Sequence, residues 1–309
     1  MTYPYCITEK VNSRNLDIAS FLAMATFWGL NYPVLKIALG IEGPFPILFY
    51  RILIGAATSF LIFSTKIKIP RDLGTHMKIF IAGMLNVSLF MSFWFLGEQL
   101  EPASLSSILV YSFPIFAIVF SVLFLGDTLS LTKVVAAILG FAGVIMIFVQ
   151  QVTVSSVLGV ALLLLSAIFW ALGTVYFKKY LAGTSPSTYN SLQLLYSIPV
   201  ILVIAVFTDP VGLMHPSLDL LVLALILGFP GTSLAYLIFF HLYRKYNVSD
   251  ISSYFFAVPA ISLVLSYLIL SEKSSLLAYI GFLLISGGIF FSYHDKSAKK
   301  RKIEAVNSP

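Results

Sequence analysis

Long apolar runs that lack charged side chains constrain this fold more than any other feature of the sequence. A helix needs about 20 apolar residues to cross the hydrocarbon core of a membrane. The run 134–177 is long enough for two helices, which the polar residues 150–156 separate, and 45–64 is a further span although it contains Arg51. The remaining spans are 18–35, 79–97, 102–126, 180–208, 220–240, 251–271 and 274–293. The sequence therefore predicts ten transmembrane helices.

The composition places the chain in a membrane rather than in water. Hydrophobic residues make up 59% of the 309 residues and charged residues only 10%, whereas about a quarter of a soluble domain is charged. In lipid only helices and closed barrels satisfy every backbone group, and a barrel strand would alternate apolar and polar residues. We therefore expect an all-α integral membrane protein. The single cysteine, Cys6, excludes an intramolecular disulfide and a cysteine-based metal cage.

Lys and Arg residues are distributed unevenly between alternate loops. If the N-terminus is cytoplasmic, sixteen of them lie in cytoplasmic segments, two lie outside, and Arg51 lies within a span. Such an excess is typical of cytoplasmic loops. It predicts that the N-terminal tail 1–16 and the basic C-terminal tail 294–309 are both cytoplasmic in a multi-pass protein of the plasma membrane. It also accounts for the net charge of +6 without a nucleic-acid partner.

The two halves of the chain share residues in the same order. Phe-Trp-Gly-Leu at 27–30 reappears 142 residues later as Phe-Trp-Ala-Leu at 169–172. Later in each half the offset is 145, and the matching pairs are Ser107 and Ser252, Pro114 and Pro259, Asp127 and Glu272, and Gly143 and Gly288. We predict one five-helix repeat at 17–149, a linker at 150–155 and a second repeat at 156–293. Because five is odd, the repeats would be inverted in the membrane, as in many secondary transporters.

The chain resembles the EamA-type drug/metabolite transporters. The resemblance rests on the two halves, Trp-Gly at 28–29, and the turn Leu-Gly-Asp-Thr-Leu at 125–129 before a glycine-rich helix. It implies a ten-helix exporter or permease with both termini in the cytoplasm. Asp127 stands where the family more often has Glu, and Ser271 replaces the glycine of the second turn. The family carries amino acids, purines, drugs and other metabolites, so the substrate stays open.

Arg51 is the anomaly of the second predicted span. A charge at the centre of a span costs about 2.5–3.5 kcal/mol, and somewhat less away from the centre. Arg51 either extends its side chain to the external interface or faces a water-filled cavity and binds a carboxylate through its planar fork. Gln193 stands at the equivalent position of the second repeat. A cation and a neutral amide at these positions would make the cavity asymmetric.

Two tryptophans and several polar residues lie deep in the predicted spans. Trp28 and Trp170 are too deep for an interfacial belt, so they either pack in the core or line a cavity. Each other polar group alone is typical of a hydrogen bond between helices, but together with the indoles they suit a planar or amphipathic solute. These further candidates are Asn31, Tyr32, Asn86, Tyr111, Tyr236 and Tyr254.

Pro114 and Pro259 are candidate hinges at equivalent positions of the two halves. A proline within a helix leaves the carbonyl four residues earlier without its bond, so each is either a static kink or a bending point for alternating access. Small residues on two helices indicate close packing, between helices of one chain or between the copies of a homodimer. They are Ala136, Gly140, Gly143, Gly281 and Gly288.

The predicted spans contain no deep Asp or Glu, so we expect a facilitator, an exchanger or an unusual coupling site rather than ordinary proton coupling. There is no nucleotide-binding motif and no sign of a cofactor. The function predicted is a secondary transporter that moves a small polar or amphipathic metabolite, such as an amino acid, by alternating access. A channel-like facilitator is the alternative. A membrane-embedded enzyme would need a cluster of His, Asp or Glu at a common depth, which the sequence does not show.

Overall fold

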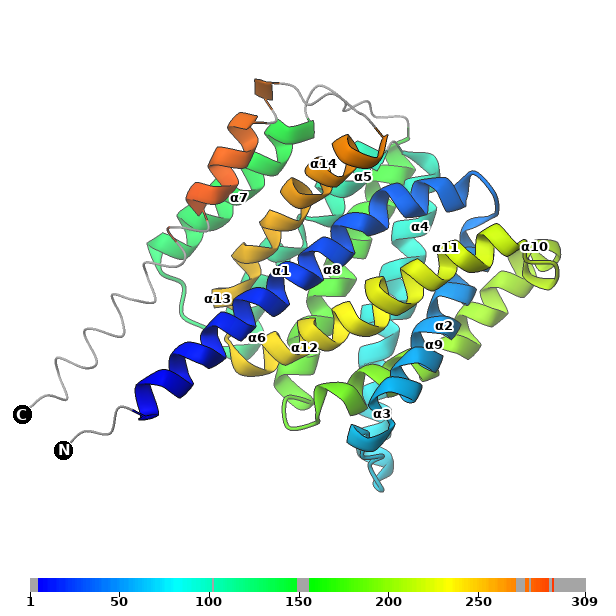
Figure 1. Cartoon of the computed structure of the whole chain (residues 1–309), viewed down its shortest axis with the longest axis horizontal. Helices are drawn as coiled ribbons and strands as arrows, with labels where there is room; N and C mark the ends of the chain where they lie inside the picture. Colours follow the sequence, from blue (N-terminus) through cyan, green and yellow to red (C-terminus); the bar gives the residue numbers. More distant parts are fainter. Residues whose placement is uncertain are drawn as a thin grey trace, which may run out of the picture.

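A computed structural model describes residues 5–101, 103–148, 156–270, 276–277, 279–288 and 291, and this part of the chain contains helices and no strand (Figure 1). The all-α prediction is confirmed. The first half contains α1 (Tyr5–Leu39), α2 (Pro44–Phe63), η1 (Ser64–Lys66), α3 (Leu73–Gly83), η2 (Met84–Leu89), α4 (Phe90–Leu100), α5 (Ala103–Val110), α6 (Phe113–Leu125) and α7 (Leu131–Phe148). The second half contains α8 (Val157–Tyr180), α9 (Pro186–Thr208), α10 (Pro210–Met214), α11 (Leu218–Gly228), η3 (Phe229–Leu234), α12 (Ala235–Lys245), α13 (Val248–Ile251), η4 (Ser252–Phe256) and α14 (Ala257–Leu270).

Seven continuous helices in the described chain are long and apolar enough to cross a membrane. Shorter apolar helices occupy Leu131–Met146, Val248–Ile261 and Tyr279–Gly288, within or beside the other three predicted spans. The count of ten spans stays a prediction. The linker 150–155 and the C-terminal tail 294–309 lie outside the described residues.

Local sequence signals explain where several helices begin and end. α2 and α9 each have a proline in the first turn, where no backbone donor is needed. The Asp72 carboxylate accepts a bond from the Thr75 backbone N–H at 2.7 Å and so caps α3. The backbone N–H and the side chain of Thr75 lower the pKa of Asp72 below its usual value. α6 ends at Gly126, whose φ of 70° is the left-handed conformation that glycine adopts without strain.

The two halves repeat the same series of helices, including a rare element. η2 and η3 are six-residue π-helical segments, and their bounds differ by 145 residues. α11 and α12 have the bounds of α3 and α4 shifted by the same number. π-helical turns are rare, and they frequently occur at functional sites. The internal repeat therefore extends to details of the backbone.

The two halves interleave rather than lie apart. α1 packs against α11, α12 and α14 of the second half, and α8 packs against η2, α4 and α6 of the first (Figure 1). α2 and α9 pack against each other. The centre of the molecule is therefore built from both halves.

The predicted span 102–126 is interrupted rather than bent. α5 ends at Val110 and α6 begins at Phe113, with a turn between them that is closed by a bond from the Ser112 N–H to the Leu109 carbonyl at 3.2 Å. The sequence predicted Pro114 within a continuous helix, but it lies in the first turn of α6. In the second half the 3-10 segment η4 precedes α14, which contains Pro259 near its start.

The small residues predicted to form close packing do so within one chain. The α-hydrogen side of Gly143 on α7 faces the Gly281 carbonyl, where a Cβ would lie only 2.6 Å away. A Cβ on Gly288 would lie 2.8 Å from the Ala136 carbonyl oxygen and 3.1 Å from the Gly140 nitrogen. These faces are therefore occupied by each other, and a homodimer, which stays a prediction, would have to use another surface.

Candidate functional site

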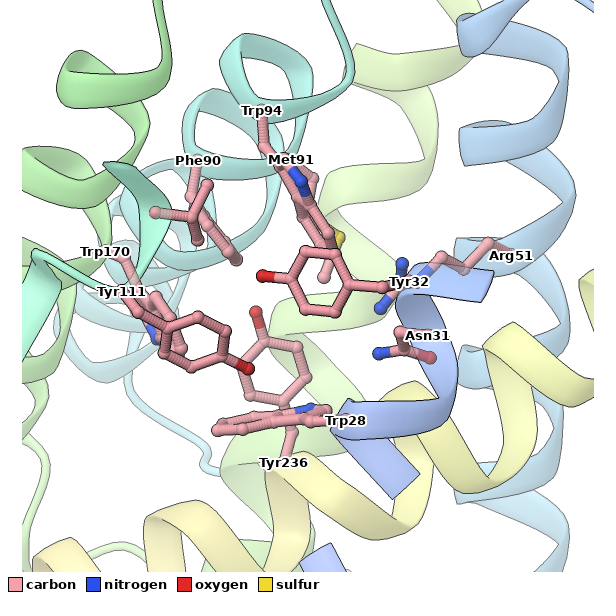
Figure 2. A pocket seen from close by; sticks show the side chains of 11 residues that line it. Trp28, Asn31, Tyr32, Arg51, Phe90, Met91, Trp94, Tyr111, Trp170 and Tyr236 are labelled. Carbon is pink, nitrogen blue, oxygen red and sulfur yellow. The ribbon is translucent and has the colours of Figure 1, made fainter. Parts of the chain in front are cut away.

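A narrow cavity lies at the centre of the molecule, where helices of both halves meet (Figure 2). Its volume is about 20 Å³, enough for about one water molecule. Side chains must therefore move apart before a solute can enter. It is lined by Trp28, Asn31, Tyr32, Arg51, Phe90, Met91, Trp94, Val110, Tyr111, Trp170 and Tyr236.

Arg51 is held in the interior with incomplete bonding. Its side chain is 1% exposed, and Nε donates to the Thr232 hydroxyl at 2.9 Å. The guanidinium carbon lies 5.5 Å from the ring centroid of Trp94 and 5.9 Å from that of Phe95. One terminal nitrogen, Nη1, is buried without a hydrogen-bond partner. Of the two alternatives for Arg51, this position agrees with a side chain that faces a cavity. It does not agree with one that extends to the external interface.

Aromatic rings form most of the cavity wall. Trp28 and Trp170 meet edge to face with centroids 5.3 Å apart. Trp170 stacks on Phe113 at 3.8 Å and on Phe90 at 4.8 Å. The hydroxyl groups of Tyr32 and Tyr111 point toward the middle of the ring cluster (Figure 2). Such a wall offers contact area to a flat or apolar body, and its hydroxyl groups can orient polar atoms.

Two asparagines lock the helices of one half onto glycines of the other. Asn31 on α1 packs against Gly231 in η3, and Asn86 in η2 packs against Gly173 on α8. The repeat offsets relate Asn31 to Gly173 and Asn86 to Gly231, so the two contacts are equivalent. At both places a Cβ would collide with the asparagine side chain. Glycine is therefore needed for this close approach.

The two central indoles differ in one hydrogen bond. Trp28 Nε1 donates to the Gly231 carbonyl at 3.2 Å. The equivalent acceptor for Trp170 would be the Asn86 carbonyl, but the Tyr236 hydroxyl donates to it at 3.0 Å. Trp170 Nε1 is buried without a partner. Met91 stands at the position equivalent to Tyr236 and has no hydroxyl, which explains why only one indole is displaced.

Seven of the ten predicted binding residues line this cavity, and three do not. Asn86 lies behind the wall, where its amide donates to the Tyr189 hydroxyl at 3.1 Å. Gln193 donates to Asn190 at 3.1 Å. Tyr254 contacts Phe21 with centroids 6.3 Å apart. A binding role for any of the ten stays a prediction. The seven at the cavity are Trp28, Asn31, Tyr32, Arg51, Tyr111, Trp170 and Tyr236.

Sequence reasoning missed the contribution of α4. Phe90 and Trp94 line the cavity, and Glu98 follows one further turn along the same helix. Their spacing of four residues places them on one helix face. That spacing, with an indole and a carboxylate in it, was the signal that could have pointed to this face.

The sequence predicted no Asp or Glu deep in a span, but it did not anticipate a buried carboxylate near the end of one. α4 continues to Leu100 within a candidate span of Leu73–Leu100, and Glu98 is only 7% exposed. Trp94 Nε1 donates to Glu98 Oε2 at 2.5 Å, and Oε1 is buried without a partner. The predicted span stopped at the last uncharged residue, but an indole N–H can hold a carboxylate inside the helix bundle.

Different contacts close the two ends of the bundle. At one end Asp17 on α1 accepts bonds from Lys245 Nζ at 2.5 Å and from the Tyr246 hydroxyl at 2.6 Å. The equivalent place at the other end has Gly159, packed against Glu101, whose carboxylate accepts a bond from the Ser156 N–H at 2.6 Å. In the described residues no group of His, Cys, Asp or Glu is arranged to hold a metal ion.

The fold and the cavity define a multi-pass membrane protein with two homologous halves, and comparisons place it in a family. The EamA-like transporter family matches residues 16–149 and 157–294, so the chain belongs to this family. It is 31% identical over 299 residues to the Bacillus subtilis protein called uncharacterized transporter YvbV, covering 96% of each chain.

More distant proteins agree with this assignment. An uncharacterized transporter of Archaeoglobus fulgidus is 29% identical, over 86% of this chain and 94% of its own. A probable amino-acid metabolite efflux pump of Escherichia coli is 25% identical, over 88% of this chain and 92% of its own. One crystal structure superposes with a TM-score of 0.74 at 18% identity, covering 89% of this chain and 96% of the other. This last likeness supports the fold alone.

Proposed function

We propose that the chain is a secondary transporter that moves a small polar or amphipathic metabolite, such as an amino acid, across the plasma membrane by alternating access. The observation that carries the proposal is the unpartnered Nη1 of Arg51 at a narrow central cavity built from both halves. Burying a cation whose hydrogen-bond donors lack partners costs free energy, and such residues in membrane proteins commonly have a function. A bound anionic group would complete its bonds.

The proposed arrangement has ten spans, with the second five-helix repeat inverted relative to the first. The start of α1 and the loops 64–72 and 181–185 lie on the lower side of the molecule in Figure 1, and the loops 40–43 and 209–217 lie at the upper right. In the first group, Lys10 and Arg14 lie near the start of α1, the loop 64–72 contains Lys66, Lys68 and Arg71, and Lys178 and Lys179 lie just before 181–185. This supports a cytoplasmic location for both termini.

The site chemistry favours a carboxylate attached to an apolar or aromatic body. Arg51 would bind the carboxylate bidentately, and the rings of Trp28 and Trp170 would contact the rest of the solute. The name of the Escherichia coli relative, an amino-acid metabolite efflux pump, supports the same class of solute. Movement of the two halves past one another would open the cavity alternately to each side.

The test begins with a thermal-shift screen of the purified protein against amino acids, nucleobases and organic cations. Stabilisation by one class, followed by counterflow of a labelled member in proteoliposomes, is expected of a carrier. Single-channel current would support the channel-like alternative, and chemical conversion of the solute would support an enzyme. Arg51→Ala, matched for expression, should abolish the stabilisation while the protein still elutes as a folded monodisperse species.

A further inference from the structure

Glu98 is a buried charge that the proposed transport function does not use. The described part of the chain contains three buried carboxylates, Asp17, Glu98 and Glu101. Asp17 pairs with Lys245, and Glu101 accepts a backbone N–H. Glu98 belongs to none of the ion pairs in this part of the chain, and its Oε1 has no hydrogen-bond partner. A carboxylate inside a membrane protein is costly and commonly marks a proton or ion pathway.

Trp94 lies between Glu98 and Arg51. Its indole N–H holds Glu98 Oε2 at 2.5 Å, and its ring centroid lies 5.5 Å from the Arg51 guanidinium carbon. The two opposite charges are therefore close enough to attract each other through the low-dielectric interior, although they make no direct contact. Each of them retains one unpartnered polar atom.

Few other charged groups face Glu98. From α1, Tyr32 and Lys36 interact with it electrostatically, and from α2 only Arg51 does so. The η2 and α5 segments that pack on α4 contain no charged residue. α8 also packs on α4 near Gly97, but its basic residues lie in its last turn at the other end. Of the two cations that interact with Glu98, Arg51 is buried and Lys36 is exposed.

We propose that Glu98 is a proton-binding site linked to Arg51, so that an anionic group of the solute and a proton enter the site together. The inference rests on the proposed transport function. With the site empty, the charges of Arg51 and Glu98 cancel. When an anion binds Arg51, that cancellation is lost, and Glu98 takes a proton from water to form the neutral acid. The net charge of the interior then stays zero, and the proton leaves to water when the anion leaves.

The proposal has a reciprocal consequence. If anion binding favours protonation of Glu98, then protonation favours anion binding by the same factor. Uptake of one proton per anion gives at most about a tenfold gain in affinity for each pH unit of acidification. A solute carried in this way would move with the proton gradient.

Trp94 provides a direct reporter of Glu98. The chain has three tryptophans, so ¹⁵N labelling of the indoles in nanodiscs gives three resonances, which single Trp→Phe variants assign. We expect the Trp94 resonance to move between about pH 4 and 9 in the wild type and to stay fixed in Glu98→Gln. In Arg51→Gln the Trp94 resonance should move at a higher pH than in the wild type. Unchanged Trp28 and Trp170 resonances verify folding. A Trp94 resonance that ignores pH, or behaves alike in wild type and Glu98→Gln, overturns the proposal.

Phenylacetate tests the link to an anion, with phenylethylamine as the control that has the same ring and no carboxylate. We expect phenylacetate to bind more tightly at low pH, by up to about tenfold per pH unit, and to lose this dependence in Glu98→Gln. Absence of phenylacetate binding, or equal pH dependence in both proteins, contradicts the link. Counterflow needs no net proton movement, so a protein that shows counterflow without a titrating Trp94 would reject the proton site and leave the carrier function intact.

Discussion

Arg51 combines a full positive charge with a single strong side-chain bond, to Thr232, and two aromatic neighbours. Thr232 in turn donates to the Leu227 carbonyl at 2.8 Å, so its hydroxyl is fixed and presents a lone pair to Arg51. The guanidinium is thereby oriented by the second half of the chain while its backbone belongs to the first. A residue positioned in this way responds to movement between the halves.

Arg51→Lys should impair transport nearly as much as Arg51→Ala. Lysine keeps the charge but loses the planar fork that bonds Thr232 and a carboxylate together. Loss of one charge-assisted bond costs about 1.5–3 kcal/mol, or roughly 10- to 150-fold in affinity. Solute counterflow at matched expression measures the effect. A lysine variant with wild-type counterflow would remove Arg51 from the binding site.

Tyr236→Phe should change the bonding of an indole on another helix. Without the hydroxyl, the Asn86 carbonyl becomes free for Trp170 Nε1, as the Gly231 carbonyl is for Trp28. The indole ¹⁵N spectrum should then show the Trp170 resonance moving toward that of Trp28. Met91→Leu changes the equivalent residue without altering a polar group and is the matched control. If the Trp170 resonance stays in place, Tyr236 does not compete for that carbonyl.

At the scale of elements, three segments near the centre depart from regular α-helix: η2, η3 and the break between α5 and α6. η2 and η3 bring Asn86 and Gly231 into the interior, and the break between α5 and α6 brings Tyr111 to the cavity. Irregular backbone is tolerated at membrane depth only where protein or a cavity surrounds it. These segments are therefore the places where the helices are weakest and closest to the site.

Pro114→Ala and Pro259→Ala should leave solute binding intact and slow counterflow. In the first half alanine would let α6 extend backward across the break at Ser112, which would stiffen a segment that has to bend. The expected change is several-fold in rate, with stabilisation by the solute in the thermal-shift assay unchanged. Pro199→Ala, inside α9 and away from the breaks, serves as the control. Wild-type rates in both variants would make the two prolines structural only.

The positions of the helices were predictable from the sequence because each apolar run is about as long as a helix that crosses the membrane. Trp28, Arg51 and Trp170 were identified as candidate cavity residues because polar or amphipathic side chains are unusual deep in an apolar span. The break at Tyr111 and the π turns were not predictable, since their backbone depends on packing against the opposite half. Glu98 was missed because the end of a span was equated with the first charged residue. Gln193 was included because it is equivalent to Arg51 in the repeat, but that equivalence does not determine whether the side chain points into the cavity.

At the scale of the whole molecule, the two ends of the bundle are closed by different forces. The Asp17 carboxylate at one end binds Lys245 and Tyr246 and lies 3.7 Å from His241 Nε2. At the other end Gly159 packs directly against Leu100 and Glu101. An ion pair weakens with salt, whereas close packing does not. The two openings should therefore respond differently to ionic conditions.

Asp17→Asn should open the end held by Lys245. The pair is partly exposed, so its loss is worth about 1 kcal/mol, or roughly five-fold in population. Met91→Cys in a Cys6→Ser background places a thiol in the cavity wall, and its labelling in inside-out vesicles should be about five-fold faster in Asp17→Asn. High salt should produce part of the same change in the parent. Equal labelling rates with and without Asp17 would exclude an ionic closure.

The matched π turns also record the order in which features of this chain arose. A π turn accommodates one residue more than an α turn, and η2 and η3 hold it at the same place in both halves. One insertion before the duplication of an ancestral half accounts for both, whereas two later insertions would have to strike the same turn. Where the halves differ, at least one of them has changed since the duplication. When the halves are aligned, Arg51 is equivalent to Gln193, Met91 to Tyr236, and Glu98 to Tyr243. The two halves therefore share one scaffold, including its π turns, and differ in the charges that this scaffold carries.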